Sequence, residues 1–375
     1  MKKLSIDKDY LQRILADLLA IPSPSGFTDN IVHRIAKELD SFGLEFELTR
    51  RGAIRATIPG KTKTPDRAIV SHVDTLGAMV RKLKSNGRLA LAPIGTWSSR
   101  FAEGGRVTVF TDNAGAIRGT VLPLKASGHI YNKEIDTQPV NWENLELRVD
   151  VQASSQDDLQ KHGFAIGDFV GFDPGTEFTK DGFVVSRHLD DKAGVASVLS
   201  ALKAVVDAKI ELPVDCHPLF TVSEEVGSGA SSVLHQDVAE LVSVDNGTSG
   251  PGQNSDETGV TISMMDLAGP YDYHLSRNLI KIANDFGLTI GRDVFKWYRS
   301  DAASAVEAGN DIHTALLCFG LDASHGYERT HLRSLVDLAT ILTLYMQSPP
   351  LFARDKSGLG PLEGFPELPT DSSNG

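Results

Sequence analysis

The pattern of apolar residues changes twice along this chain, and these two changes constrain its fold more than any other feature. Residues 1–74 show two helical patterns followed by strand-like runs, and residues 179–348 alternate strands with helices. Between them, residues 75–178 contain short strand-like runs separated by turn residues, which is typical of a small barrel or sandwich. We therefore expect an α/β sandwich domain formed by 1–74 and 179–348, with 75–178 inserted into it.

Within the α/β parts, the sequence predicts helices over Tyr10–Ile21, Asn30–Ser41, Lys192–Ala208, Ser276–Phe286, Ser300–Glu307 and Thr330–Met346. In the inserted segment, SSQDDLQ supplies a cap and an acidic first turn for one short helix around Ser155–His162. The polar stretch GKTKTPDR, residues 60–67, is expected to be a loop before the buried strand AIVSHVD. Residues 349–375 are rich in Pro, Gly and Ser, so we expect a tail with little fixed structure.

Composition excludes several classes of partner. The chain has 375 residues, with 41% hydrophobic and 23% charged residues, as in ordinary globular proteins of two domains. A formal net charge of −12 argues against nucleic acid and against anionic membrane surfaces. No run of eighteen apolar residues occurs, so no transmembrane helix is expected.

The compartment is predicted from the N-terminus and the cysteines. Charged residues from Asp7 to Asp9 interrupt the apolar core that a signal peptide would need. Cys216 and Cys318 lie in apolar runs and are interpreted as reduced core residues. We therefore expect a cytoplasmic enzyme.

Several strand-like runs lead into side chains that can bind a metal. The run VVSRHLDDKAG, residues 184–194, ends in Asp190 and Asp191 at the start of a helix. His72 ends AIVSHVD, the pair Glu224 and Glu225 follows HPLFTVS, Asp245 ends ELVSVD, and His325 follows TALLCFG. Ligands collect at the carboxyl ends of strands in open α/β sheets, so these side chains are expected to meet there. Imidazoles with carboxylates suit zinc, manganese or cobalt better than calcium.

Each of these side chains has an ordinary alternative when it is considered alone. His72 could be a core histidine, Asp245 a turn residue, and two adjacent glutamates could simply be solvated. The glutamate pair, however, lies between an apolar run and a glycine-rich one, where two charges would be costly unless bound. The combination therefore favours a metal site, with Asp74 as a neighbour that fixes the His72 imidazole.

The successive motifs HVD, LDDKAG, EEVGSGA and SVDNGT, followed by a histidine near the last helix, resemble the co-catalytic metallopeptidases. The position of the insertion, between His72 and Asp190, is similar to that in the M42 branch, which contains glutamyl and tetrahedral aminopeptidases. IPSPSG and AIGDFVGFDP are also similar to that branch. The resemblance covers about residues 8–347. It implies a mixed-sheet α/β/α sandwich like that of zinc exopeptidases, with an inserted β-barrel-like domain for assembly and access.

The resemblance also implies the role of each site residue. It makes Asp190 a bridge between two divalent metal ions per subunit, zinc in the first place and cobalt or manganese as alternatives. His72 and Asp245 would complete one metal site, and Glu225 and His325 the other. Glu224 would be the general base, and Asp74 would orient His72.

Two assignments stay open in the sequence. The last ligand is expected to be His325, with His331 as the alternative. Where the family shows a glycine-rich segment ending Thr-Asp-Ala, this chain has Trp297, Tyr298 and Arg299 before Ser300-Asp301-Ala302. We interpret Asp301 as a solvated helix cap, with a substrate contact as the alternative.

The function implied is a metallo-aminopeptidase that removes N-terminal residues from short peptides and forms a homo-oligomer. Two rivals stay open: an amidohydrolase or carboxypeptidase acting on small acylated amino acids or peptide amides, and a non-catalytic peptide-binding relative. An intact Glu224 speaks against the second rival. The sequence leaves the metal, the preferred N-terminal residue and the symmetry of the oligomer undecided.

Overall fold

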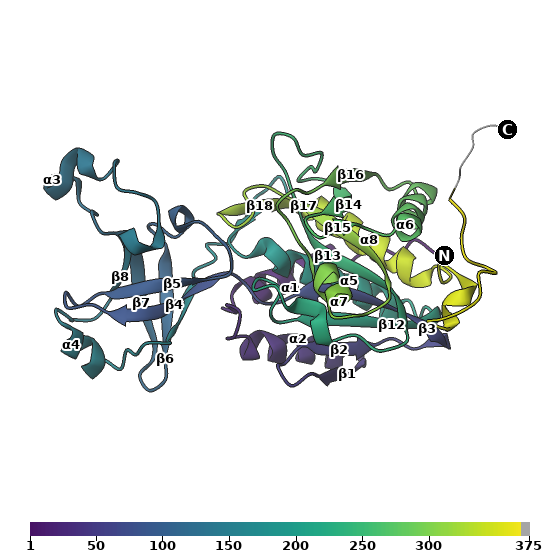
Figure 1. The fold of residues 1–375 in the computed structure, drawn as a ribbon, viewed down its shortest axis with the longest axis horizontal. Coiled ribbons are helices and arrows are strands. Elements are labelled where there is room, and N and C mark those ends of the chain that lie inside the picture. Colours follow the sequence, from purple (N-terminus) through teal and green to yellow (C-terminus); the bar gives the residue numbers. More distant parts are fainter. Residues whose placement is uncertain (369–375) are drawn as a thin grey trace.

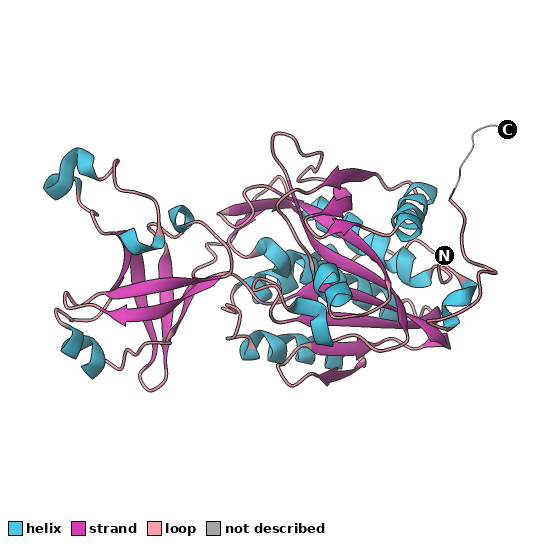
Figure 2. Ribbon diagram, in the orientation of Figure 1, coloured by secondary structure: helices cyan, strands magenta, loops and turns pink. Residues whose placement is uncertain are grey.

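The computed structural model describes residues 1–368, which form an α/β body and a separate β-barrel (Figure 1). The barrel is inserted between two parts of the body, so that the chain enters it after β3 and returns from it before α5. Figure 2 shows that helices are concentrated in the body, whereas the barrel consists mainly of strands. The predicted fold class, an α/β fold with an inserted barrel, is confirmed.

A mixed sheet of nine strands forms the centre of the body in the described residues, in the order β1-β2-β12-β3-β13-β17-β14-β15, with β16 beside β14. The four central strands are parallel, and β2 and β14 flank them in the antiparallel direction. Their bounds are β1 Glu45–Leu48, β2 Ile54–Thr57, β3 Gly60–His72, β12 Leu212–Thr221, β13 Val238–Thr248, β14 Val260–Asp266, β15 Gly269–Pro270, β16 Ile290–Val294 and β17 His313–Leu321.

Six helices in the described residues pack around this sheet: α1 Lys8–Leu19, α2 Asp29–Phe42, α5 Leu189–Asp207, α6 Tyr273–Asp285, α7 Asp301–Glu307 and α8 Leu332–Gln347. The helix α5 contacts α1, α8 and the central strands, and most of its residues are buried. Its small residues, mainly Ala, Ser and Gly, allow these neighbours to approach closely. In contrast, α1 and α2 bury only one face, as their amphipathic patterns predict.

The barrel closes in the order β4-β5-β8-β7-β6-β9. Its strands are β4 Gly77–Leu83, β5 Leu89–Ile94, β6 Arg106–Thr111, β7 Gly115–Pro123, β8 Leu145–Val149 and β9 Phe169–Phe172. Alternate side chains such as Val80, Val107 and Leu147 fill an interior core of its own. Two short helices lie outside it, α3 Gly128–Tyr131 and α4 Gln156–Lys161, and the second confirms the helix expected near residues 155–162.

A small third sheet corrects one sequence prediction. It contains β10 Glu177–Phe178, β11 Phe183–Ser186 and β18 Glu328–His331. Thr330 and His331, expected at the start of the last helix, pair instead with β11, and α8 begins at Leu332. Pairing with a strand more than a hundred residues away decides this boundary, so the local pattern could not show it.

The predicted loop over residues 60–67 is also wrong, because these residues form the first half of β3. Their side chains are largely exposed up to Thr64, which is why the stretch looks like a loop. Parallel pairing with β12 holds the backbone, with Gly60 opposite Leu212 and Thr62 opposite Val214. A Cβ on Gly60 would lie 2.2 Å from the Val214 backbone, so this close approach requires glycine.

None of the helices within residues 1–368 is both long enough and apolar enough to cross a membrane. Of the predicted tail, residues 349–368 include one 3₁₀ turn, Ala353–Lys356, and its first residues contact the body. Arg67 donates to the Pro349 carbonyl at 3.1 Å, and the Leu351 amide donates to Glu240. Residues 369–375 lie outside the described residues.

Candidate metal centre

The predicted site residues gather at the carboxyl edge of the central parallel strands. His72 is the last residue of β3, and Glu224 and Glu225 follow the end of β12. Asp245 lies near the end of β13, and His325 follows β17. Parallel strands end at one edge of a sheet, which explains why residues so far apart in sequence meet.

Asp190 reaches the same place by another route. The strand before it, β11, belongs to the small third sheet, so the expectation that Asp190 ends a strand of the main sheet is wrong. Its backbone is held by Glu328 of β18, whose carboxylate accepts from the amides of Leu189 at 2.7 Å and of Asp190 at 3.2 Å. The same carboxylate accepts from the His325 amide at 3.0 Å. Glu328 thus fixes two site residues from one position.

The gathered side chains form two overlapping groups that could each hold a cation. In the first, ligand atoms of His72, Asp190 and Asp245 all lie within 4.8 Å of one another. The second contains Asp190, Glu225 and His325 with the same spacing. Asp190 belongs to both groups, so one carboxylate is placed between two candidate ion positions.

The His72 ring is oriented by its neighbours. Its Nδ1 lies 2.9 Å from the backbone carbonyl oxygen of Asp74, and its Nε2 lies 3.1 Å from Asp190 Oδ1. A proton on Nδ1 therefore leaves the Nε2 lone pair facing the site. The Asp74 carboxylate is 3.6 Å from the ring; it accepts from the Ser25 hydroxyl at 2.5 Å and from the amides of Glu224 and Glu225 at 3.1 and 3.3 Å. Asp74 thus holds the ring through its carbonyl and the glutamate turn through its carboxylate.

Asn246 is a site residue that the sequence analysis missed. Its Nδ2 donates to Asp190 Oδ2 at 2.8 Å and to Asp245 Oδ1 at 3.1 Å, and the residue is 1% exposed. It thereby links the carboxylate shared by both groups to one that belongs to a single group. Its position next to Asp245 in SVDNG was the only signal, and an Asn-Gly pair is more often read as a turn.

The electrostatics of the centre are dominated by buried negative charge. Burial raises the pKa of Glu225 to about 8, and burial with the Asp190 charge raises the pKa of Asp245 to about 7. For Asp190 burial also acts to raise the pKa, but hydrogen bonds with His325 and His72 outweigh it and lower the pKa. Within the described residues, Glu225 Oε1 is buried without a hydrogen-bond partner. Nitrogen and oxygen donors, excess negative charge and an unpartnered carboxylate oxygen fit divalent cations.

Glu224 lies beside both groups without belonging to either. Its Oε2 is 3.9 Å from His72 Nε2, and its side chain keeps 15% exposure toward the cavity. Burial is the largest cause that raises the pKa of Glu224 well above its usual value, and the Asp245 charge adds to it. A carboxylate with this position and environment can accept a proton from a nucleophile held between the two groups.

The contacts of the two candidate histidines, His325 and His331, decide between them. His325 Nε2 lies 3.3 Å from Asp190 and 3.6 Å from Glu225, and its Nδ1 contacts the Thr96 carbonyl oxygen at 2.8 Å. His331 lies elsewhere: its Nε2 contacts the Asp181 carbonyl oxygen, and its Nδ1 accepts from the Arg333 amide. Thr96 follows β5, so the inserted barrel region contacts the centre through His325.

The interpretation of Asp301 as a solvated cap is wrong. Asp301 is 2% exposed and accepts from the Thr221 hydroxyl at 2.7 Å, beneath the turn that carries the glutamates. A Cβ on Gly229 would lie 1.7 Å from Asp301 Oδ1, so only glycine fits against this carboxylate. The helix position was predicted correctly, but burial depends on what packs over the helix, which the local sequence does not show.

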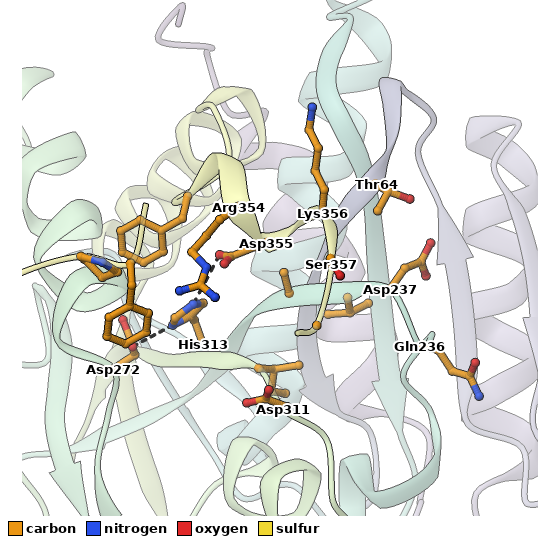
Figure 3. A pocket seen from close by; sticks show the side chains of 17 residues that line it. Thr64, Gln236, Asp237, Asp272, Asp311, His313, Arg354, Asp355, Lys356 and Ser357 are labelled. Atoms are coloured by element: carbon orange, nitrogen blue, oxygen red, sulfur yellow. Dashed lines mark hydrogen bonds and ion pairs between the residues drawn. The ribbon is translucent and has the colours of Figure 1, made fainter. Parts of the chain in front are cut away.

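The centre opens into a cavity of about 510 Å³. Besides predicted site residues, its lining includes Val226, Gly227 and the segment Trp297–Arg299. A second cavity, of about 550 Å³, lies at the amino edge of the same strands, where Figure 3 shows His313 between Asp272 and Asp355. Within residues 1–368, both groups of potential metal ligands include residues that line the first cavity, and none of their members lines the second. The first cavity is therefore the candidate site.

Comparisons with known proteins identify the family of this chain. The model of the M42 glutamyl aminopeptidase family matches residues 52–341. The protein YhfE of Bacillus subtilis (strain 168) is 38% identical over 336 residues, which are 90% of this chain and 97% of YhfE.

Two solved structures share the fold. A TET aminopeptidase from the marine sediment archaeon Thaumarchaeota archaeon SCGC AB-539-E09 has a TM-score of 0.82 at 17% identity, covering 90% of this chain and 96% of its own. The TET1 peptidase of Pyrococcus horikoshii, which can assemble into a tetrahedron or a large octahedral shell, has a TM-score of 0.79 at 23% identity, covering 90% and 99%. At these identities the structures establish the fold alone. Taken with the family match, they show that the chain belongs to the M42 glutamyl aminopeptidase family and is a metallo-aminopeptidase.

Proposed function

We propose that this enzyme removes N-terminal residues from short peptides with two divalent metal ions, zinc in the first place and cobalt or manganese as alternatives. The observation that carries the proposal is the position of Asp190 in both ligand groups, with Glu224 beside them. In this arrangement His72 and Asp245 complete one ion site, and Glu225 and His325 complete the other. The cavity of about 510 Å³ is large enough for a few residues of peptide.

When bound, the cations supply Lewis acidity that polarises the scissile carbonyl and lowers the pKa of the attacking water. Glu224 Oε2 accepts the proton of that water and returns it to the leaving amine. Asp74 keeps Glu224 and Glu225 in place by accepting from both backbone amides. Glu328 and Asn246 keep Asp190 between the two ligand groups.

The test is a survey of hydrolysis on a peptide mixture, read by mass spectrometry, with protein reconstituted separately in zinc, cobalt and manganese. Free-amine aminoacyl anilides are compared with N-acylated dipeptides. We expect release of N-terminal residues, no cleavage of N-acylated substrates, and loss of activity in a Glu224→Gln control. Cleavage of the acylated dipeptides would instead favour the amidohydrolase or carboxypeptidase alternative, and binding of peptides without any cleavage would favour a binding protein.

We also propose a homo-oligomer in which residues 75–178 form an assembly and access domain and residues 1–74 with 179–348 form the catalytic domain. The barrel projects from the body in Figure 1, and the TET1 peptidase of similar fold assembles into closed shells. Size-exclusion chromatography with light scattering should give a multiple of 40.4 kDa. A monomer would contradict the assembly. The buried, unpaired thiols of Cys216 and Cys318 support our proposal of a cytoplasmic location.

A further inference from the structure

The hydroxyl of Tyr298 has no explained role in the fold. Among residues 1–368 it has no hydrogen-bond partner, although its oxygen is buried. A buried hydroxyl without a partner costs roughly 1–3 kcal/mol of stability. Such groups are rare in folded proteins, and a site that awaits a ligand is one explanation for them.

Tyr298 lies on the wall of the catalytic cavity, together with Asp190, Glu224 and Asp245. Its hydroxyl interacts with the Asp245 carboxylate and so opposes, in part, the rise in the pKa of that carboxyl caused by burial and Asp190, but the contact falls short of hydrogen-bond geometry. The ordinary pKa of a tyrosine hydroxyl is about 10, so at neutral pH the group carries its proton and acts as a neutral hydrogen-bond donor.

The ring is held rigidly, so the position of this donor is fixed before a substrate arrives. It packs against Phe295, with the ring centroids 5.2 Å apart, beside the buried residues Leu316 and Cys318. The Tyr298 carbonyl accepts from the Leu267 amide at 2.9 Å, which anchors the backbone. Fixed donors are most effective where charge develops during a reaction, because they need no reorganisation.

The cationic neighbour on the same wall is less suited to this task. The Arg299 guanidinium already donates twice to the Glu307 carboxylate, so its charge is paired. In the rest of the predicted site, His72 and His325 are proposed ligands and the Asn246 amide donates to Asp190 and Asp245. The other side chains are carboxylates, which repel a developing negative charge. The shielded phenol of Tyr298 thus supplies a neutral donor next to the reacting groups.

We propose that Tyr298 is a catalytic residue whose hydroxyl donates a hydrogen bond to the oxygen of the scissile carbonyl as that oxygen becomes negatively charged. This inference rests on the proposed peptidase function. The proton stays on Tyr298 throughout, and the bond to the attacking water oxygen forms as the carbonyl π bond opens.

The test compares Tyr298→Phe with Tyr10→Phe in the metal-loaded enzyme. Tyr10, in α1, also has a buried hydroxyl without a partner among the described residues, but it does not line the cavity. In Tyr298→Phe we expect kcat to fall about 10- to 100-fold, somewhat less than for loss of a backbone-like oxyanion donor, with KM within about threefold. Tyr10→Phe should keep the wild-type kcat. Neither variant should lose thermal stability, because each removes a hydroxyl that has no partner.

Metal content and its titration provide the second readout. We expect both variants to bind metal as wild type does. A kcat of Tyr298→Phe within twofold of wild type would overturn the inference, as would a loss that excess metal restores, since the hydroxyl would then only position Asp245. If wild type released no N-terminal residues, the proposed function would fail and this inference with it. If wild type released N-terminal residues and Tyr298→Phe did so at the same rate, this inference would be refuted and the proposed function would stand.

Discussion

Two cavities lie at opposite edges of the same parallel strands, and their charged groups are balanced differently. At the amino edge, His313 lies 2.8 Å from Asp272 and 3.4 Å from Asp355, and the buried Arg67 is paired with Glu240 at 3.5 Å. At the carboxyl edge, four carboxylates surround two imidazoles in the predicted site. The clusters at the two edges are similar in composition, since both contain acids and histidines. The surplus of unpaired negative charge at the carboxyl edge distinguishes the candidate ion site.

Metal removal should produce the largest difference between the two edges. Chelation followed by dialysis should lower activity by at least about 10⁴-fold, because metal ions contribute several kcal/mol to the transition state. Isothermal titration of the stripped protein with zinc should then show two equivalents per chain, with none bound in Asp190→Ala. Binding that survives in Asp190→Ala would place the ions elsewhere, including the His313 cavity.

Glu224→Gln should lower kcat about a thousandfold while leaving metal binding intact. The substitution preserves shape but removes the base, and general bases contribute about 10²- to 10⁴-fold. Steady-state kinetics and metal analysis of the same preparation test this. A matched substitution, Glu257→Gln, alters a half-buried carboxylate that is paired with Arg329 outside the cavity and should leave kcat unchanged. A lost metal ion in Glu224→Gln would mean that Glu224 is a ligand instead.

Arg67→Leu should destabilise the protein by about 3–5 kcal/mol, because it leaves the buried Glu240 carboxylate without its cation. Arg67 is 1% exposed and also donates to Ser348 at 3.1 Å. Urea unfolding of the metal-free protein measures the change. Adding Glu240→Gln should recover part of it, and kcat at 25 °C should stay near wild type. An unchanged free energy of unfolding in Arg67→Leu would show that the pairing of Arg67 with Glu240 contributes little to stability.

His313→Gln should have the smallest effect: we expect it to lower the free energy of unfolding by about 1 kcal/mol at pH 5.5 and by less at pH 9. The hydrogen bond to Asp272 raises the pKa of His313, with Asp355 and Glu240 adding to it against burial. A raised folded-state pKa stabilises fully below about 6.5, the unfolded value, and this contribution disappears as pH rises through the folded pKa. Unfolding curves across pH test this, and Asp272→Asn should show the same trend. If the loss of stability in His313→Gln increased with pH, a stabilising interaction of protonated His313 with Asp272 would be contradicted.

The sequence predicted much of this molecule because its signals are local. Apolar periodicity located α1, α2, α5 and the barrel strands, and the change in pattern marked the insertion. Side chains at the ends of strand-like runs identified His72, Asp190, Glu225, Asp245 and His325, which the structure brings together. A strand that ends at a sheet edge delivers its last side chain there whatever its neighbours are, so strand order was not needed.

What only the tertiary structure decided involves partners distant in sequence. Residues 60–67 became a strand because β12 pairs with them, and Asp190 arrives from a separate sheet because β11 pairs with β18. Asp301 is buried because the turn after β12 packs over it. Glu328 and Asn246 contact Asp190, and Tyr298 lines the cavity, although the sequence did not predict these positions. Burial and charge balance depend on the sum of neighbours in space, which no local pattern of residues contains.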